Sequence, residues 1–134
     1  TKSLGMYLTK QKEISKKIVS SRAKLTLKEL IVLCVHLESL DKAGVPIIDA
    51  IADLRDTAET ITMKNLMTDI HESLTGGEIL SQALAKHPQI FDKMFIGLIE
   101  AGEKTGKLSD IFGHLVAHFK WLELIISKIK KAIY

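Results

Sequence analysis

Apolar residues recur at helical spacing in one segment of this chain after another, and no segment shows sustained alternation of apolar and polar residues. Between residues 25 and 119 the apolar positions follow intervals of three and four, as they do on one face of an α-helix. A strand with one buried face would instead show a period of two. The sequence therefore predicts an all-α protein without a sheet.

Capping signals mark the first expected helix and the start of the second. Thr26 and Glu29 have the spacing of a capping box at a helix N-terminus. Gly44 is placed to end that helix as the residue just beyond its C-cap. Pro46 is expected at a first-turn position of the second helix, where its missing N–H costs nothing.

Four more helices are expected at short intervals along the chain. They run from near Thr62 to the glycine pair at 76–77, from Ser81 to the His87-Pro88 step, from about Asp92 to Lys104, and from near Leu108 onward. Ser81 is assigned as the N-cap of the short fourth helix, because serine is a preferred capping residue. Short helices with short connections predict a compact bundle of about six short antiparallel helices.

The last stretch differs from the rest, because apolar residues cover most of its helical circumference. A helix of that kind is buried on all sides, paired with a partner or in contact with a membrane. Trp121, Tyr134 and the lysines between them are typical of a helix that approaches a bilayer interface. We therefore expect the chain to stop before a transmembrane segment, although the same aliphatic face could equally close a homodimer.

Charge is distributed unevenly along the chain. The net charge is +6 in residues 1–24, −6 in residues 25–119 and +3 in residues 120–134. Solvated termini are one interpretation. The other is that both basic ends lie near an anionic membrane surface, where Lys and Arg accumulate on the cytoplasmic side. An acidic body without a basic, aromatic face speaks against nucleic-acid binding.

These features divide the chain into three parts. We expect a basic lead-in, flexible or weakly helical, over residues 1–24, a helical bundle domain over 25–126 and the juxtamembrane end of the last helix over 127–134. The chain as given has no run of 18 apolar residues and no secretory signal sequence, so it is not expected to span a membrane by itself.

The segment Gly102-Glu-Lys-Thr-Gly-Lys-Leu108 resembles a phosphate-binding loop at first sight, but its spacing differs. A Walker A loop has four residues between its first glycine and its Gly-Lys pair, followed by Ser or Thr. Here three residues separate Gly102 from Gly106, and Leu108 takes the place of the hydroxyl. Helical spacing before the segment also replaces the strand that such a loop needs. We interpret the segment as a tight helix-to-helix junction, with nucleotide binding as the competing interpretation.

Two small groups of side chains are candidate metal ligands. Glu100 and Glu103 lie on adjacent turns of one expected helix, so they form either a solvated acidic face or an oxygen site for a hard cation such as calcium. Asp110, His114 and His118 have a spacing that could hold zinc, but a fourth ligand is missing. The sequence predicts an acidic face in the first case and ordinary helix-surface residues in the second.

The sequence lacks the motifs of common catalytic sites, including the nucleophile elbow, the dinucleotide-binding glycine fingerprint and the HExxH metalloprotease motif. Cys34 is the only cysteine, which excludes an internal disulfide. Its position among apolar helix residues predicts a buried, unreactive thiol. We expect a protein that is not an enzyme and that requires no cofactor.

Four motifs together resemble the type II secretion system protein F family, which also includes the inner-membrane platform proteins of type IV pili. The motifs are the segment 37–51 with Ala43, Gly44 and Pro46, the segment 77–84 with Gly77 and Ser81, the segment 87–91 with Pro88 and Phe91, and the segment 102–108 with Gly102, Glu103, Gly106 and Leu108. They occur in family order over residues 26–126. Thr105 replaces a family serine, and Asp92 stands where proline is frequent.

This resemblance implies a function and a location. It implies the first cytoplasmic domain of a polytopic protein at the cytoplasmic face of the bacterial inner membrane. Such a protein scaffolds a secretion or pilus machine and couples its hexameric assembly ATPase to pilin or pseudopilin assembly, in contact with other platform proteins. The resemblance also implies self-association, as a homodimer, and calcium binding through acidic residues such as Glu103. The alternative is a soluble helical adaptor without a membrane link.

Overall fold

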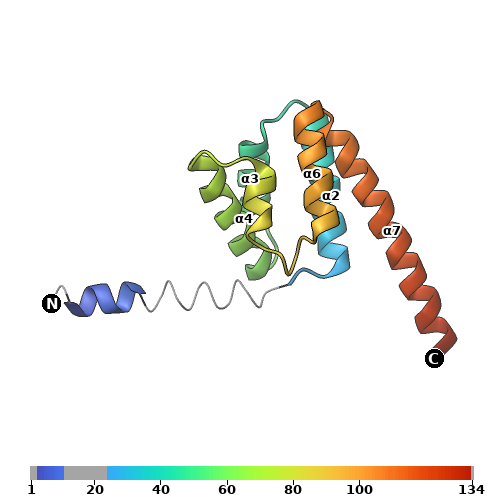
Figure 1. Cartoon of the computed structure of the whole chain (residues 1–134). Helices are drawn as coiled ribbons and strands as arrows, with labels where there is room; N and C mark the ends of the chain where they lie inside the picture. Colours follow the sequence, from blue (N-terminus) through green and yellow to red (C-terminus); the bar gives the residue numbers. More distant parts are fainter. Residues whose placement is uncertain (1–2, 11–23, 134) are drawn as a thin grey trace.

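The computed structural model describes residues 3–10 and 24–133 of the chain. All regular structure within these residues is helical, which confirms the predicted all-α class (Figure 1). A short helix covers residues 3–10. The helices that follow are α2 (Leu27–Lys42), α3 (Ile47–Asp56), α4 (Ile61–Thr75), α5 (Leu80–Ala85), α6 (Lys93–Thr105) and α7 (Leu108–Ile133). Most of the expected basic lead-in lies outside the described residues.

The helices from α2 to α7 share one core. α2 packs most extensively against α7, α3 packs against α4, and α6 packs against α7. The short α5 lies between α4 and α6 and contacts both. Three phenylalanines line the side of the core where α6 meets α7, with ring centroids 4.9 Å apart for Phe91 and Phe95 and 6.1 Å apart for Phe95 and Phe119. Apolar burial of this kind supplies most of the stability of a small helical domain.

Cys34 lies in this core, as the sequence predicts. Its side chain is completely buried in α2, and desolvation raises the pKa of the thiol to about 12. The thiolate is the reactive form of cysteine, so a thiol with so high a pKa is inert in the folded protein.

The predicted glycine stops are confirmed at two helix ends. After α2 the N–H of Gly44 donates to the carbonyl of Asp41, and the N–H of Val45 donates to the carbonyl of Leu40, both over 3.0 Å. The same pair of bonds closes α4 at Gly77. The φ angles of Gly44 and Gly77 are +81° and +99°, a region that favours glycine because it has no Cβ atom.

One of two expected helix boundaries needs correction. Pro46 is the N-cap of α3 and not a first-turn residue. Its ψ angle of 144° keeps it extended, while its carbonyl already accepts from the N–H groups of Asp49 and Ala50. α4 begins at Ile61, next to the expected Thr62, and Thr60 caps it by accepting a hydrogen bond from the N–H of Met63.

The prediction that all helices of the bundle are short is wrong for the last one. α7 is a single helix of 26 residues, and its C-terminal part projects beyond the other helices of the bundle (Figure 1). No proline interrupts this segment, and its leucines, lysines and alanines favour helix, so the helix continues past the last residues that the bundle buries. The end of the expected bundle segment, residues 108–126, and residues 127–133 of the expected juxtamembrane end thus belong to one helix, α7.

The N-termini of α2 and α4 are joined through their caps. The predicted capping box is confirmed: the N–H of Glu29 donates to Oγ1 of Thr26 over 3.1 Å, and the N–H of Thr26 donates to Oε1 of Glu29 over 3.0 Å. The second carboxylate oxygen of Glu29 accepts from Oγ1 of Thr60, the N-cap of α4, over 3.2 Å. One carboxylate therefore serves two helix termini.

Glu29→Gln is expected to make the protein less sensitive to acid. Hydrogen bonding, chiefly from the backbone of Thr26, lowers the pKa of Glu29 below its ordinary value of 4.5. A lowered folded-state pKa means that this carboxylate stabilises the protein fully above about pH 4.5 and loses its contribution as the pH falls through the folded value. We expect the urea midpoint to fall less between pH 7 and pH 3 in the variant than in the parent, and Glu59→Gln to retain the parental fall. An equal fall in Glu29→Gln would show that another group dominates.

Candidate functional site

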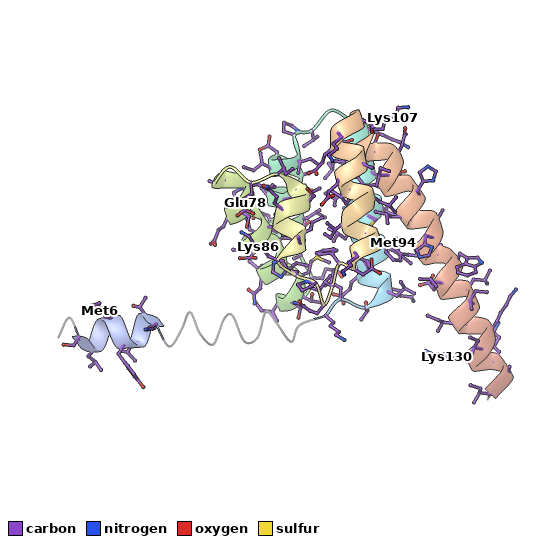
Figure 2. The ribbon with its side chains drawn as sticks, viewed as in Figure 1. Met6, Glu78, Lys86, Met94, Lys107 and Lys130 are labelled. Atoms are coloured by element: carbon purple, nitrogen blue, oxygen red, sulfur yellow. The ribbon has the colours of Figure 1, made fainter. Side chains whose placement is uncertain are left out.

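The junction between α6 and α7 is a close helix-to-helix contact. Gly102 is buried in the last turns of α6, and a Cβ atom placed on it would lie 2.8 Å from Cγ1 of Ile111 and 3.2 Å from the Cα atom of Leu108. Gly106 has a φ of +70° and ends α6, and the N–H of Lys107 returns to the carbonyl of Gly102 over 3.1 Å. The segment therefore joins two helices, as predicted from its spacing. Lys107 lies at this end of the bundle (Figure 2).

Glu103 connects this junction to a second motif. Its Oε2 atom accepts a hydrogen bond of 2.9 Å from the backbone N–H of Ser81, in a partly buried position. Ser81 is the second residue of α5, where backbone N–H groups lack partners within the helix. A carboxylate at a helix N-terminus also interacts favourably with the helix dipole. Glu103 of α6 is thus an N-terminal cap of α5 that comes from another helix.

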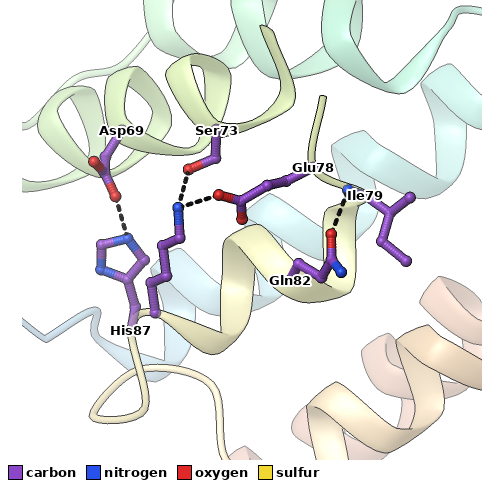
Figure 3. Close-up of polar contacts among 7 residues, drawn as sticks. Asp69, Ser73, Glu78, Ile79, Gln82 and His87 are labelled. Carbon is purple, nitrogen blue, oxygen red and sulfur yellow. Dashed lines mark hydrogen bonds and ion pairs between the residues drawn. The ribbon is translucent and has the colours of Figure 1, made fainter. Parts of the chain in front are cut away.

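The assignment of Ser81 as an N-cap is therefore wrong. Ile79 occupies the N-cap position, and the side chain of Ser81 is buried within α5. The side chain of isoleucine cannot accept a hydrogen bond, so half of a capping box is missing. Gln82 provides the other half, because its Oε1 atom accepts from the N–H of Ile79 over 3.2 Å (Figure 3). The glutamine three residues after the cap was the signal for this helix start in the sequence.

Polar contacts also fix α5 to α4. Nε2 of His87 lies 2.6 Å from Oδ2 of Asp69, and the imidazole is buried (Figure 3). Nζ of Lys86 contacts Oγ of Ser73 and the carboxylate of Glu78. Sequence reasoning found none of these pairs, because Asp69 and His87 are 18 residues apart and no local spacing relates them.

Pro88 and Phe91 form the connection that follows α5. The N–H groups of Ile90 and Phe91 both donate to the carbonyl of His87 over 3.0 Å, so Pro88 occupies the second position of a tight turn. Phe91 is buried against Phe95. The side chain of Asp92 then caps α6 by accepting from the N–H of Phe95 over 2.9 Å. The turn and its aromatic residue direct the chain from α5 into α6.

The structure brings three of the four motifs together. The segments 77–84 and 87–91 form α5 and its two connections, and Glu103 of the segment 102–108 caps α5. Ala43, Gly44 and Pro46 belong to a separate connection, between α2 and α3. We use the name α5 clamp for α5, its two connections, and the side chains of α4 and of the α6–α7 junction that contact them. Its polar groups hold helices in place and form no catalytic arrangement of nucleophile and base.

The candidate metal ligands do not gather into a cluster. Glu100 is exposed and Glu103 is half-buried. The imidazole of His118 packs near the ring of Trp121, with 6.3 Å between ring centroids. No group of three or more His, Cys, Asp or Glu side chains within residues 3–10 and 24–133 is arranged to hold a metal ion. Calcium binding at Glu103 remains a prediction.

Two basic ends of the chain are expected to lie near a membrane. The structure describes the C-terminal one up to residue 133 and the N-terminal one only in part. Lys128, Lys130 and Lys131 are exposed on the projecting part of α7, where Figure 2 labels Lys130. The basic residues of the segment 11–23 lie outside the described residues. None of the helices described is both long and apolar enough to cross a membrane.

Comparisons with known proteins agree with the four motifs. The sequence profile described as "Type II secretion system (T2SS), protein F" matches residues 33–133. The type IV pilus assembly protein TapC of Aeromonas hydrophila is 30% identical over 112 residues, which are 84% of this chain and 27% of the relative. The type IV pilus assembly protein PilC of Thermus thermophilus is 32% identical over 80% of this chain and 26% of the relative.

A relative named for secretion matches as well. The type II secretion system protein F of Vibrio cholerae is 23% identical over 81% of this chain and 27% of the relative. The chain thus spans about a quarter of the length of the curated relatives that it matches. The family match over residues 33–133 covers almost the whole of the bundle, including the α5 clamp and α7.

Proposed function

The chain belongs to the type II secretion system protein F family, and we propose that it is a cytoplasmic domain of an inner-membrane platform protein of a type II secretion or type IV pilus machine. The observation that carries this proposal is the family match over residues 33–133, from within α2 to the end of α7. Relatives named for pilus assembly and for secretion match 84% and 81% of this chain. The proposed role is structural and not enzymatic.

We further propose that this domain contacts the hexameric assembly ATPase and other platform proteins, and helps to couple the ATPase to pilin or pseudopilin assembly. A domain that transmits motion must behave as one rigid body. The α5 clamp supports this, because contacts from α4 and α6 hold the shortest helix of the bundle. Within the described residues, every buried side-chain N or O atom has a hydrogen-bond partner. Fully satisfied polar contacts of this kind make a core rigid.

Charge supports the same proposal. The segment 25–119 carries a net charge of −6, which favours contact with a basic protein surface and disfavours contact with anionic lipids. The lysines at the end of α7 favour an anionic membrane surface, at about 1 kcal/mol for each residue near the surface. This distribution would keep the bundle available to protein partners while one end lies at the cytoplasmic face of the inner membrane.

An in-frame deletion of codons 25–133 from the intact gene tests the proposal in the source bacterium. We expect loss of surface pili or of secreted protein, loss of the ATPase from purified platform complexes, and recovery of both when the intact gene is supplied. Normal assembly in the deletion strain would refute the proposal. The alternative, a soluble adaptor, predicts that the intact gene product stays in the supernatant when membranes are sedimented, whereas the platform role predicts that it sediments with them.

A further inference from the structure

A groove lies between the start of α2 and the projecting part of α7, at the end of the bundle that the proposed function places near the membrane. Figure 1 shows how α7 leaves the other helices at this end. The groove has a volume of about 650 Å³, within the range of about 300–1,000 Å³ that is usual for small-molecule sites. It is therefore large enough for a discrete ligand.

The floor of the groove is apolar and continues along α7. Leu27 of α2 is half-buried, and Ile126 of α7 is 43% exposed. Ile129 and Ile133 follow Ile126 at intervals of three and four residues, so they continue the same face of the helix, and they are 53% and 72% exposed. An apolar ligand chain that starts in the groove can therefore lie along this stripe toward the end of α7.

Three lysines and one glutamate line the same groove. Lys28 comes from α2, and Lys130, Lys131 and Glu123 come from α7, where Figure 2 labels Lys130. Within residues 3–10 and 24–133, none of these four side chains forms an ion pair with another residue. Three positive charges and one negative charge give the groove a net charge of +2, whereas the segment 25–119 as a whole carries −6. An anionic group is thus attracted to this groove and repelled by the bundle as a whole.

We propose that the groove binds one molecule of an anionic phospholipid. A matching ligand must combine a negatively charged group for the lysines with an apolar chain for the floor, and an anionic phospholipid has both. In this arrangement the phosphate lies between Lys28 and Lys130, and an acyl chain covers Leu27 and Ile126. Lysine side chains suit this role, because their methylene groups extend the apolar surface while their ammonium groups reach the phosphate oxygens.

This inference rests on the proposed placement of the domain at the inner membrane and adds a specific contact to it. Charge alone would attract the lysines at the end of α7 to any anionic surface, whichever side of the helix they occupy. A discrete site requires α2 as well as α7, and it requires both the headgroup and the acyl chain. The bound lipid would attach the bundle itself to the membrane through α2, and not only the end of α7.

Titration of the 134-residue chain with dihexanoylphosphatidylglycerol tests the proposal. Below the critical micelle concentration this lipid is monomeric, so no membrane surface is present. We expect saturable changes in the amide NMR signals of Leu27, Lys28, Ile126 and Lys130. Dihexanoylphosphatidylcholine has the same chains without the net charge, and glycerol phosphate has the anionic group without the chains. Both should bind much more weakly.

Single substitutions distinguish the groove from general attraction by charge. Lys28→Ala and Lys130→Ala should each weaken binding about fivefold, the loss expected for one nearby lysine. Lys128→Ala is the matched control, because Lys128 is exposed on the same part of α7 but does not line the groove. Its loss should weaken binding less than about twofold, because salt screens charges over about 8 Å. Glu123→Gln should strengthen binding, because it removes the negative charge from the groove.

Several results would overturn the proposal. These are the absence of saturable changes, equal binding of the two lipids, binding of glycerol phosphate as tight as that of the anionic lipid, or equal losses in Lys128→Ala and Lys130→Ala. Changes in the same signals on concentrating the chain alone would show that a second copy fills the groove. None of these results bears on the platform role, which the deletion strain tests separately. Normal assembly in that strain would refute the platform role and leave lipid binding in the titration unaffected.

Discussion

Gly102→Val is expected to lower the free energy of unfolding by about 3 kcal/mol, in the range for overpacking a tight core position. A Cβ atom at this position would lie 2.8 Å from Cγ1 of Ile111 and 3.1 Å from Cδ1 of Leu108. It would also lie 3.2 Å from the Cα atom of Leu108, so a change of rotamer cannot remove the overlap. α6 and the start of α7 would have to separate. The melting temperature, followed by circular dichroism, should fall by about 10–15 °C for a domain of this size.

Gly97→Val is the control for this prediction. Gly97 also lies within α6, but it is exposed, and a Cβ atom placed on it has no heavy atom within 4 Å. The helix propensities of glycine and valine differ by less than about 0.5 kcal/mol, so this variant should unfold within a few degrees of the parent. Unchanged unfolding in Gly102→Val, or equal losses in both variants, would contradict the role of Gly102 as a close-approach residue.

The fold could be predicted from the sequence wherever the determinant was local. The capping box of Thr26 and Glu29 and the glycine stops at Gly44 and Gly77 depend on residues a few positions apart, and the structure confirms them. The predicted position of Pro46 within its helix was wrong by one residue. Proline suits both the N-cap and the first turn, and only the backbone ψ angle distinguishes these two positions. The length of α7 could not be predicted from burial, because the helix continues beyond the bundle that buries its first half.

Only part of the α5 clamp could be predicted from the sequence. Its glycines, Pro88 and Phe91 could be assigned from motif spacing, whereas its polar contacts could not. Ser81 appeared to be the cap because serine suits that role, yet the structure uses Glu103 from 22 residues away. Asp69 and His87 pair over a similar separation. Contacts of this kind depend on how the helices pack against one another, so the residue pattern of a single helix does not predict them.

The capping role of Glu103 changes how its acidity should be interpreted. From the sequence, Glu103 was either part of a solvated face or a calcium ligand. The structure shows its carboxylate bound to the N–H of Ser81, in a position that links α6 to α5. An acidic residue next to a glycine can therefore stabilise the packing of helices. Gly102 lets α7 approach α6 closely, while the carboxylate of the next residue, Glu103, binds the N-terminus of α5. Calcium binding and capping would use the same carboxylate, and one set of variants can distinguish them.

Glu103→Ala is expected to lower the free energy of unfolding by about 2 kcal/mol, because it leaves the partly buried N–H of Ser81 without its charged acceptor. Glu103→Gln keeps an acceptor and should cost less. Glu100→Ala is the matched control: Glu100 is exposed one turn earlier in α6, and its loss should change stability by less than about 0.5 kcal/mol. Urea unfolding in EDTA measures all three, and equal stability of Glu103→Ala and the parent would contradict the cap.

Calcium titration of the same variants tests the second role of Glu103. A ligand that binds only the folded chain at 100 times its dissociation constant raises stability by about 2.7 kcal/mol. If calcium binds at Glu103, the parent and Glu100→Ala should gain melting temperature on addition of calcium, and Glu103→Gln should not. If the parent gains nothing, the calcium hypothesis is refuted while the capping prediction in EDTA stands. A gain that survives Glu103→Gln would place the ion elsewhere and leave Glu103 as a cap alone.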